Sequence, residues 1–200
     1  MINSFKDTNF SPVLQESLEH GKRVANYALA IFKGLEPLHS LSQNWQDVLE
    51  LGAKLHDIGW IYGKTAHHKV AAAMILANAI EGKTLPYVVP KSIRHLVALV
   101  ARYHRRAEPS LYHHPFKALN KKEQKAIIYL ASFIRLADAI DFSHTGAVKD
   151  VKVCYTQDNI LLNLIYTKDC QAEMKRVHVK KNLICQVFSR ELICSCDYNF

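Results

Sequence analysis

The sequence predicts a mainly α-helical protein with a small C-terminal α+β appendage. Apolar residues recur with the 3.6-residue period of a helix between positions 12 and 142, and alternating patterns replace that period after Gly146. Of the 200 residues, 49% are hydrophobic and 22% are charged, which is typical of a folded globular chain and excludes wholesale disorder. We therefore expect a helical domain over residues 1–146 and an appendage over residues 147–200.

Five helices are expected in the first part, each with one apolar stripe. Their predicted spans, in chain order, are 12–33, 43–57, 68–79, 90–104 and 121–142. Pro12 and Pro90 open the first and the fourth helix, because proline is well accommodated in the first turn. Gly34, Gly59 and Gly82 follow the ends of the first three helices, where glycine is favoured.

The appendage shows a β-β-α-β pattern. Residues 151–155 (VKVCY) and 160–166 (ILLNLIY) have the composition of strands, and a polar turn at 157–159 separates them. A helical stretch follows from about residue 171 to 188, and residues 191–196 (ELICSC) form a short last strand.

Several classes of protein are excluded by simple features. No apolar run approaches the ~18–20 residues of a membrane span, and the first ten residues lack the basic and apolar regions of a signal peptide. The cysteines are odd in number and form no C-x-x-C pair, which favours small buried side chains in a reducing compartment over disulfides or a zinc ribbon. They are Cys154, Cys170, Cys185, Cys194 and Cys196. We expect a cytoplasmic protein with no membrane partner.

The net charge of +8 is concentrated in one segment. Residues 62–122 contain eleven lysines and arginines but only two glutamates, so the net positive charge of this segment exceeds that of the whole chain. A basic surplus indicates either phosphate-bearing partners or a well-solvated surface. Helix-turn-helix, RNP-like and zinc-finger signatures are missing from the sequence, so nucleic acid is a disfavoured partner.

Polar residues stand on the apolar stripes of all five predicted helices. They are His20, His56 with the adjacent Asp57, His68, His104 and Asp138. Each of them alone is explained by an ordinary core hydrogen bond, and Asp138 has Arg135 three residues before it as a potential partner. Together, imidazoles and carboxylates that must be buried in one core indicate a divalent transition metal.

These residues and their surroundings resemble the HD superfamily of metal-dependent phosphohydrolases. The likeness is closest to the helical HD-type domain of the exopolyphosphatase / guanosine pentaphosphate phosphohydrolase family and covers about residues 14–200. It is carried by residues 18–32 (LEHGKRVANYALAIF), 53–69 (AKLHDIGWIYGKTAHHK), 100–110 (VARYHRRAEPS) and 134–153 (IRLADAIDFSHTGAVKDVKV). The actin-like phosphatase domains of that family, with their glycine-rich phosphate loops, have no counterpart in this sequence, so exopolyphosphatase activity does not carry over.

The resemblance implies a metal centre with one or two divalent ions, of Mn, Fe, Mg, Co, Ni or Zn. The residues that correspond to the ligands of the first ion are His20, His56, Asp57 and Asp138. His68 and His104 match the extra histidines of two-metal enzymes, with Asp57 as the bridge, and the neighbouring His67 remains an alternative to His68.

We expect a phosphohydrolase that cleaves a phosphate ester or anhydride by metal-activated water, with Asp57 and Asp138 as the catalytic carboxylates. A nucleotide, an alarmone, a phosphorylated metabolite or short polyphosphate would be the substrate. The residues expected to bind its phosphate are Arg102, Arg105, Arg106 and Lys64. Trp60 stands where many HD hydrolases have a phosphate-binding lysine, which leaves open a second interpretation. In that alternative the chain is a non-catalytic module that binds polyphosphate or a nucleotide for a partner chain. A homodimer through the appendage is a further open possibility.

Overall fold

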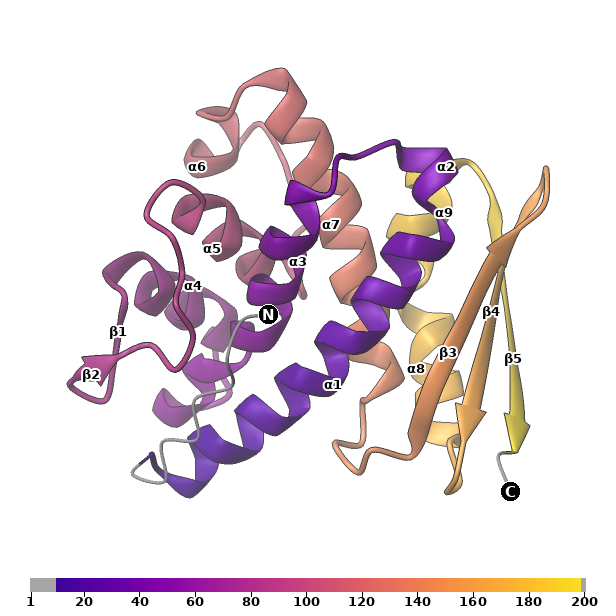
Figure 1. The fold of residues 1–200 in the computed structure, drawn as a ribbon, viewed down its shortest axis with the longest axis horizontal. Helices are drawn as coiled ribbons and strands as arrows, with labels where there is room; N and C mark the ends of the chain where they lie inside the picture. Colours follow the sequence, from indigo (N-terminus) through magenta and orange to yellow (C-terminus); the bar gives the residue numbers. More distant parts are fainter. Residues whose placement is uncertain (1–9, 199–200) are drawn as a thin grey trace.

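The computed structural model describes residues 10–198 and is mainly helical. Its helices and strands are arranged as Figure 1 shows, with the helices forming most of the body and the larger sheet lying along one edge. The helices are α1 Pro12–Gly34, α2 Glu36–His39, α3 Asn44–Leu55, the 3-10 helix η1 Ile58–Tyr62, α4 His67–Ala77, α5 Arg94–Tyr103, α6 His114–Lys117, α7 Lys121–Ile140, α8 Gln171–Lys180 and α9 Asn182–Phe188. The strands are β1 Ala79–Ile80, β2 Lys83–Thr84, β3 Val148–Tyr155, β4 Asn159–Tyr166 and β5 Glu191–Tyr198.

The five predicted helices correspond to α1, α3, α4, α5 and α7. Local signals in the sequence explain how two of them begin. The Ser11 side chain accepts a hydrogen bond from the Leu14 N–H at the start of α1, and Asn120 and Glu123 form a capping box at the start of α7. The fold class predicted from the sequence is confirmed.

Several predicted boundaries were wrong. The third helix ends at Ala77 and not at Ala79, because Asn78 adopts a left-handed conformation (φ 54°) and the chain turns into the β1–β2 hairpin. The fourth helix begins at Arg94, four residues after Pro90. The stretch 171–188 is divided at Lys181 into α8 and α9. The short elements α2, η1 and α6 carry too few residues to show a period.

The C-terminal part has the predicted β-β-α-β order. Strand β3 pairs antiparallel with β4, and β4 pairs parallel with β5, so α8 and α9 form the crossover between the parallel strands. In Figure 1 these two helices lie between the sheet and α7. This arrangement packs α8 and α9, from the C-terminal part of the chain, against α7, the last helix of the first part.

One apolar core extends through both parts of the protein. The rings of Phe32 on α1 and Phe133 on α7 lie 6.0 Å apart, and Phe188 at the end of α9 stacks on Phe133 at the same distance. This shared core does not test the predicted division into two domains near residue 147, which stays a prediction.

The five cysteines are free thiols. Cys170 is buried, but Cys154 and Cys196 are exposed, so the expectation that all of them are buried was wrong. None of the helices in residues 10–198 is long and apolar enough to cross a membrane.

Candidate metal centre

Histidine and aspartate side chains from four helical segments converge at one place in the core. His20 comes from the middle of α1 and Asp138 from the last turns of α7. His56 and Asp57 follow the end of α3, where the chain leaves the helix before η1 begins. His104 follows the last residue of α5 in the same way. Because adjacent residues on a helix diverge by about 100°, the break after α3 allows both His56 and Asp57 to face the centre.

The ring nitrogens of the histidines face the two carboxylates. His20 Nε2 lies 3.4 Å from Asp138 Oδ1 and 3.8 Å from Asp57 Oδ2. His56 Nε2 lies 3.5 Å from Asp138 Oδ1 and 3.6 Å from Asp57 Oδ1, and His104 Nε2 lies 3.4 Å from Asp57 Oδ1. The ligand atoms of His20, His56 and Asp138 lie within 4.8 Å of one another, as do those of His56, Asp57 and His104. His56 thus takes part in both of these groups of atoms that are suited to hold an ion, and Asp57 takes part in the second.

Hydrogen bonds on the far side of the imidazole rings leave the inward nitrogens available. His56 Nδ1 donates to the Ala53 carbonyl at 2.7 Å, and His104 Nδ1 donates to the Ala101 carbonyl at 2.7 Å. His20 Nδ1 donates to Asp141 Oδ2, also at 2.7 Å. In the neutral rings these bonds keep the proton on Nδ1 and leave a lone pair on Nε2, as is usual for histidines that ligate a metal.

Three buried polar atoms of the centre have no hydrogen-bond partner within the described part of the chain. They are His20 Nε2, His56 Nε2 and Asp57 Oδ1. Leaving such atoms unsatisfied costs free energy, since each has lost its water. Bound divalent cations would satisfy these atoms, and nitrogen with carboxylate oxygen is a donor set that Mn, Fe, Co, Ni and Zn accept. The residues present therefore fit a metal ion.

The two carboxylates of the centre are held in the charged form. Burial by itself raises the pKa of Asp57, but the charge of His56 and the contact with His67 hold it far below its usual range. Burial opposes the ionisation of Asp138 as well, and His20 and His56 hold its pKa well below the normal value. Burial alone lowers the pKa of His20, yet the neighbouring carboxylates of Asp138 and Asp141 raise it to about 9. Both aspartates are thus ready to receive a cation.

Asp141 is a supporting residue that the sequence analysis did not assign to the site. Its Oδ2 accepts the His20 bond and a second bond from Arg23 Nε at 2.8 Å, and its Oδ1 accepts from the Gly146 N–H. The signal was present in the sequence, because Asp141 follows Asp138 by three residues on the same stripe. Its carboxylate orients His20 and holds the turn after α7 against α1.

The structure distinguishes the two adjacent histidines at the start of α4. His67 Nε2 lies 3.1 Å from Asp57 Oδ1 and 3.3 Å from His104 Nε2, so His67 lies within the cluster. The His68 ring centre lies 6.3 Å from that of His104, and His68 lines a neighbouring cavity. His67 shares its face of α4 with the buried Ala71 and Met74, so the face that reaches the cluster lies one residue away from the face that pointed to His68.

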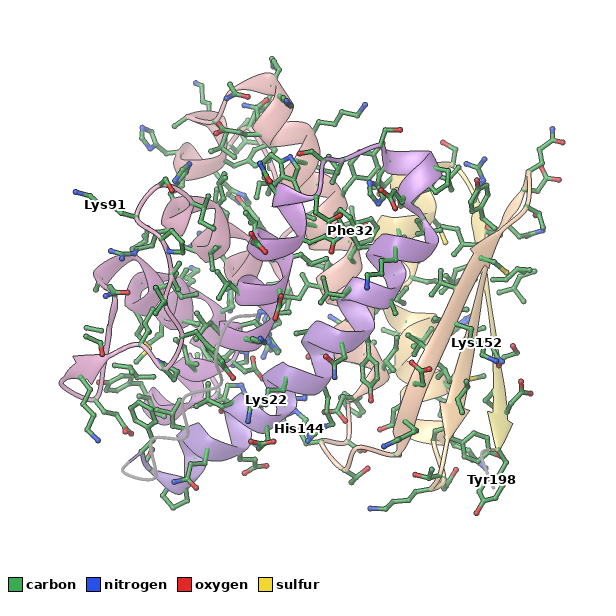
Figure 2. All side chains as sticks on the ribbon, in the orientation of Figure 1. Lys22, Phe32, Lys91, His144, Lys152 and Tyr198 are labelled. Carbon is green, nitrogen blue, oxygen red and sulfur yellow. The ribbon has the colours of Figure 1, made fainter. Side chains whose placement is uncertain are left out.

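His144 is a further residue at the centre that has no counterpart among the sequence predictions. Its ring stacks on that of His20 at 3.8 Å with an angle of 9°, and Figure 2 places it near α1 on the turn after α7. Together with His20 and Asp57 it forms a third group of atoms suited to an ion. Its position could not be read from a helical period because it lies in a turn.

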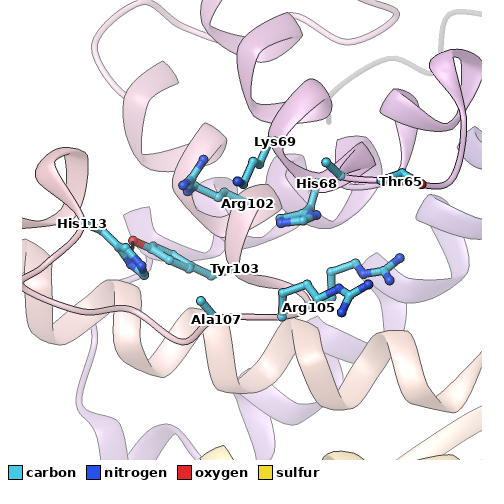
Figure 3. Close-up of a pocket in the computed structure, with 10 residues that line it drawn as sticks. Thr65, His68, Lys69, Arg102, Tyr103, Arg105, Ala107 and His113 are labelled. Atoms are coloured by element: carbon cyan, nitrogen blue, oxygen red, sulfur yellow. Dashed lines mark hydrogen bonds between the residues drawn. The ribbon is translucent and has the colours of Figure 1, made fainter.

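One cavity opens at the centre, and a second cavity lies next to it, with Arg105 on the wall of both. The smaller one, of about 240 Å³, is lined by Asp57, Trp60, His67, His104, Arg105, Asp138, Phe142, His144 and Arg176. The larger one, of about 520 Å³, is strongly basic, and Figure 3 shows His68, Lys69, Arg102 and Arg105 around it. Arg106 also lines the larger cavity, and Arg105 lines both. Lys64 lines neither; its ammonium lies 5.1 Å from the ring centre of Trp60.

Arg135 holds the turn that carries His104 and Arg105. Its Nη1 donates to the Tyr103 carbonyl and its Nη2 to the Arg106 carbonyl, both at 3.2 Å. It makes no ion pair with Asp138 in the described residues, although the two are three residues apart on α7. The turn needs this support because Arg106 has a positive φ of 60°.

We expect Arg135→Met to lower the free energy of unfolding by about 2 kcal/mol, because hydrogen bonds from a charged donor are lost and two carbonyls are left unsatisfied. Chemical denaturation measures this loss. Lys122→Met on the exposed side of α7 is the control and should change stability little. Equal stability of the two variants would show that the turn does not depend on Arg135.

The fold and the site define a class: a helical domain whose core holds a histidine–aspartate cluster compatible with a metal ion. Comparison with protein-family models shows which family within this class the chain matches. The family model described as Ppx/GppA phosphatase, domain III, matches residues 11–182. The chain therefore belongs to the Ppx/GppA phosphatase domain III family, as its resemblance in sequence implied. A search of curated proteins gives no match to it.

Proposed function

We propose that this protein is a divalent-metal-dependent phosphohydrolase that cleaves a phosphate ester or anhydride with an activated water. The observation that carries the proposal is the convergence of three buried, unpartnered ligand atoms, on His20, His56 and Asp57, beside a small cavity with Arg105 on its wall. Anionic ligands for a cation and a guanidinium for an anion stand next to each other there. This combination is what phosphoryl transfer requires.

His20, His56, Asp57 and Asp138 would hold one ion. His67 and His104, with Asp57 shared, would hold a second. A bound divalent ion supplies Lewis acidity, which polarises a phosphoryl oxygen and lowers the pKa of water.

The protein's own side chains supply the remaining roles. The Asp138 side chain is 21% exposed and lines the small cavity, so it is placed to orient a water and accept its proton. Arg105 Nη1 lies 3.2 Å from His67 Nε2, close enough to reach a phosphoryl oxygen beside the metal ligands. The basic cavity, with Arg102 and Arg106, would hold further anionic groups of the substrate. These positions favour a small phosphorylated molecule or short polyphosphate as substrate.

The test is to purify the protein, measure bound metal, and assay a panel of phosphate esters and anhydrides with added Mn²⁺, Mg²⁺, Co²⁺ or Ni²⁺. Stoichiometric metal together with turnover supports the proposal. Tight binding of polyphosphate or a nucleotide without turnover under any metal would instead support the second candidate, a binding module. Two observations favour that candidate: the basic cavity is the larger of the two, and Trp60 stands in place of a phosphate-binding lysine.

Arg105→Ala is expected to raise KM roughly tenfold or more, because charge-assisted bonds to phosphate oxygens are lost. Metal content should not change, since Arg105 is not a metal ligand. Lys91→Ala, on an outward-pointing side chain in Figure 2, serves as the control for a general loss of positive charge. Loss of metal from the Arg105 variant would show that the guanidinium supports the cluster and not the substrate.

A further inference from the structure

Helix α8 brings the C-terminal part of the chain to the metal centre. Arg176, in the middle of α8, lines the same small cavity as Asp57, Asp138 and Arg105. The sequence gives no sign of this role, because Arg176 follows Asp138 by 38 residues with two strands between them. The helix reaches the cavity because it packs against α7, which carries Asp138.

Arg176 has no anionic partner in the part of the chain that the structure describes. Its guanidinium lies 4.8 Å from the ring centre of Phe142, and its Nε is buried without a hydrogen-bond partner. Glu173, one turn earlier on α8, does not pair with it. That carboxylate is 1% exposed and accepts a bond from the Ser143 N–H at 3.0 Å, which ties the turn after α7 to α8.

An unpaired guanidinium in a partly closed cavity costs free energy until an anion enters. The carboxylates of this cavity do not meet that need, because Asp57 and Asp138 face the histidines of the metal centre. Arg105 comes from the turn after α5 and Arg176 from α8, so two different segments each contribute one guanidinium to the same space. Two planar guanidiniums suit the several oxygens of a phosphoryl group, to which each can donate two hydrogen bonds.

We propose that Arg176 binds the phosphoryl group of the substrate together with Arg105, so that the C-terminal part completes the substrate site. The inference rests on the proposed function for the identity of the reacting group. It adds Arg176 to the substrate site and gives residues 147–200 a role in that site. The metal cluster by itself does not require those residues. A protein that ends before α8 would keep His20, His56, Asp57 and Asp138 in its sequence but lose one of the two guanidiniums of the small cavity.

The experiment compares Arg176→Gln and Arg176→Lys with Lys175→Gln, a charge-removing control on the exposed side of the same helix. Two readouts are used: calorimetric binding of inorganic phosphate to the Mn²⁺-loaded protein, and KM and kcat for an ester that the panel has identified. Arg176→Gln should weaken phosphate binding at least tenfold and raise KM, while metal content and melting temperature stay at the wild-type values. The phosphate affinity and KM of Arg176→Lys should lie between those of the wild type and Arg176→Gln, because lysine keeps the charge but cannot make the bidentate contact.

Unchanged phosphate affinity in Arg176→Gln would overturn the inference, as would an equal loss in Lys175→Gln. If Arg176→Gln does not fold, Arg176→Lys decides, since wild-type phosphate affinity and KM in that variant would likewise overturn it. The two proposals fail in different ways. If no ester is turned over but phosphate binding depends on Arg176, the inference holds and the phosphohydrolase proposal fails.

Discussion

Asp57→Asn is expected to remove both metal and turnover. The carboxylate of Asp57 faces His20 through Oδ2 and faces His56, His67 and His104 through Oδ1, so it is the group that all parts of the cluster share. Asparagine keeps the shape but loses the charge and one acceptor oxygen. Loss of residues that merely orient metal ligands typically costs 10–100-fold in affinity, so loss of a shared ligand should cost about 100-fold or more.

Metal content after dialysis, metal affinity by calorimetry and phosphate-ester turnover measure this effect. Asp47→Asn is the matched control, because it removes the same charge from an exposed position of α3. A melting temperature close to that of the metal-free wild type would show that the fold survives. Retained metal with retained turnover in Asp57→Asn would contradict the assignment of the cluster as a metal centre.

The helical framework could be predicted because its signal is local. The stripe of α1 contains Val24, Ala28 and Ile31, all fully buried, and His20 continues it by one turn. A polar residue in such a stripe must face the core whatever the neighbouring elements are. The same reasoning identified His56 and His104, which stand at the ends of their helices.

The finer geometry could not be predicted because it depends on where elements begin and on what packs beside them. His67 and His68 are both buried in α4, and the rotation of this helix against its neighbours decides which of them reaches the cluster. Arg135 and Asp138 are spaced like a helical ion pair. The structure instead directs Arg135 to the carbonyls of Tyr103 and Arg106. Arg176 reaches the small cavity only because α8 packs on α7, and no local sequence pattern indicates that packing.

Gly59→Ala is expected to destabilise the protein and to disturb the metal centre together. Gly59 lies in η1, directly after the His56–Asp57 pair, where η1 packs against α4. A Cβ atom at this position would lie 2.2 Å from the His67 carbonyl oxygen and 2.8 Å from the Ala71 nitrogen. Both are backbone atoms, so the overlap cannot be relieved by turning a side chain. The two segments must separate by roughly 1 Å, and tightly packed interiors resist such a shift.

Overpacking of this kind typically costs 1–3 kcal/mol, which corresponds to a fall in melting temperature of roughly 3–10 °C for a protein of this size. His67 moves with α4, so its contact with Asp57, 3.1 Å between Nε2 and Oδ1, opens and the metal affinity falls as well. Gly82→Ala is the control: no atom lies within 4 Å of its Cβ, and only its positive φ of 73° adds a cost, of about 1 kcal/mol, far from the cluster. It should bind metal as the wild type does. A Gly59→Ala protein with wild-type stability and metal affinity would show that η1 and α4 approach less closely, and the placement of His67 beside Asp57 would fail with it.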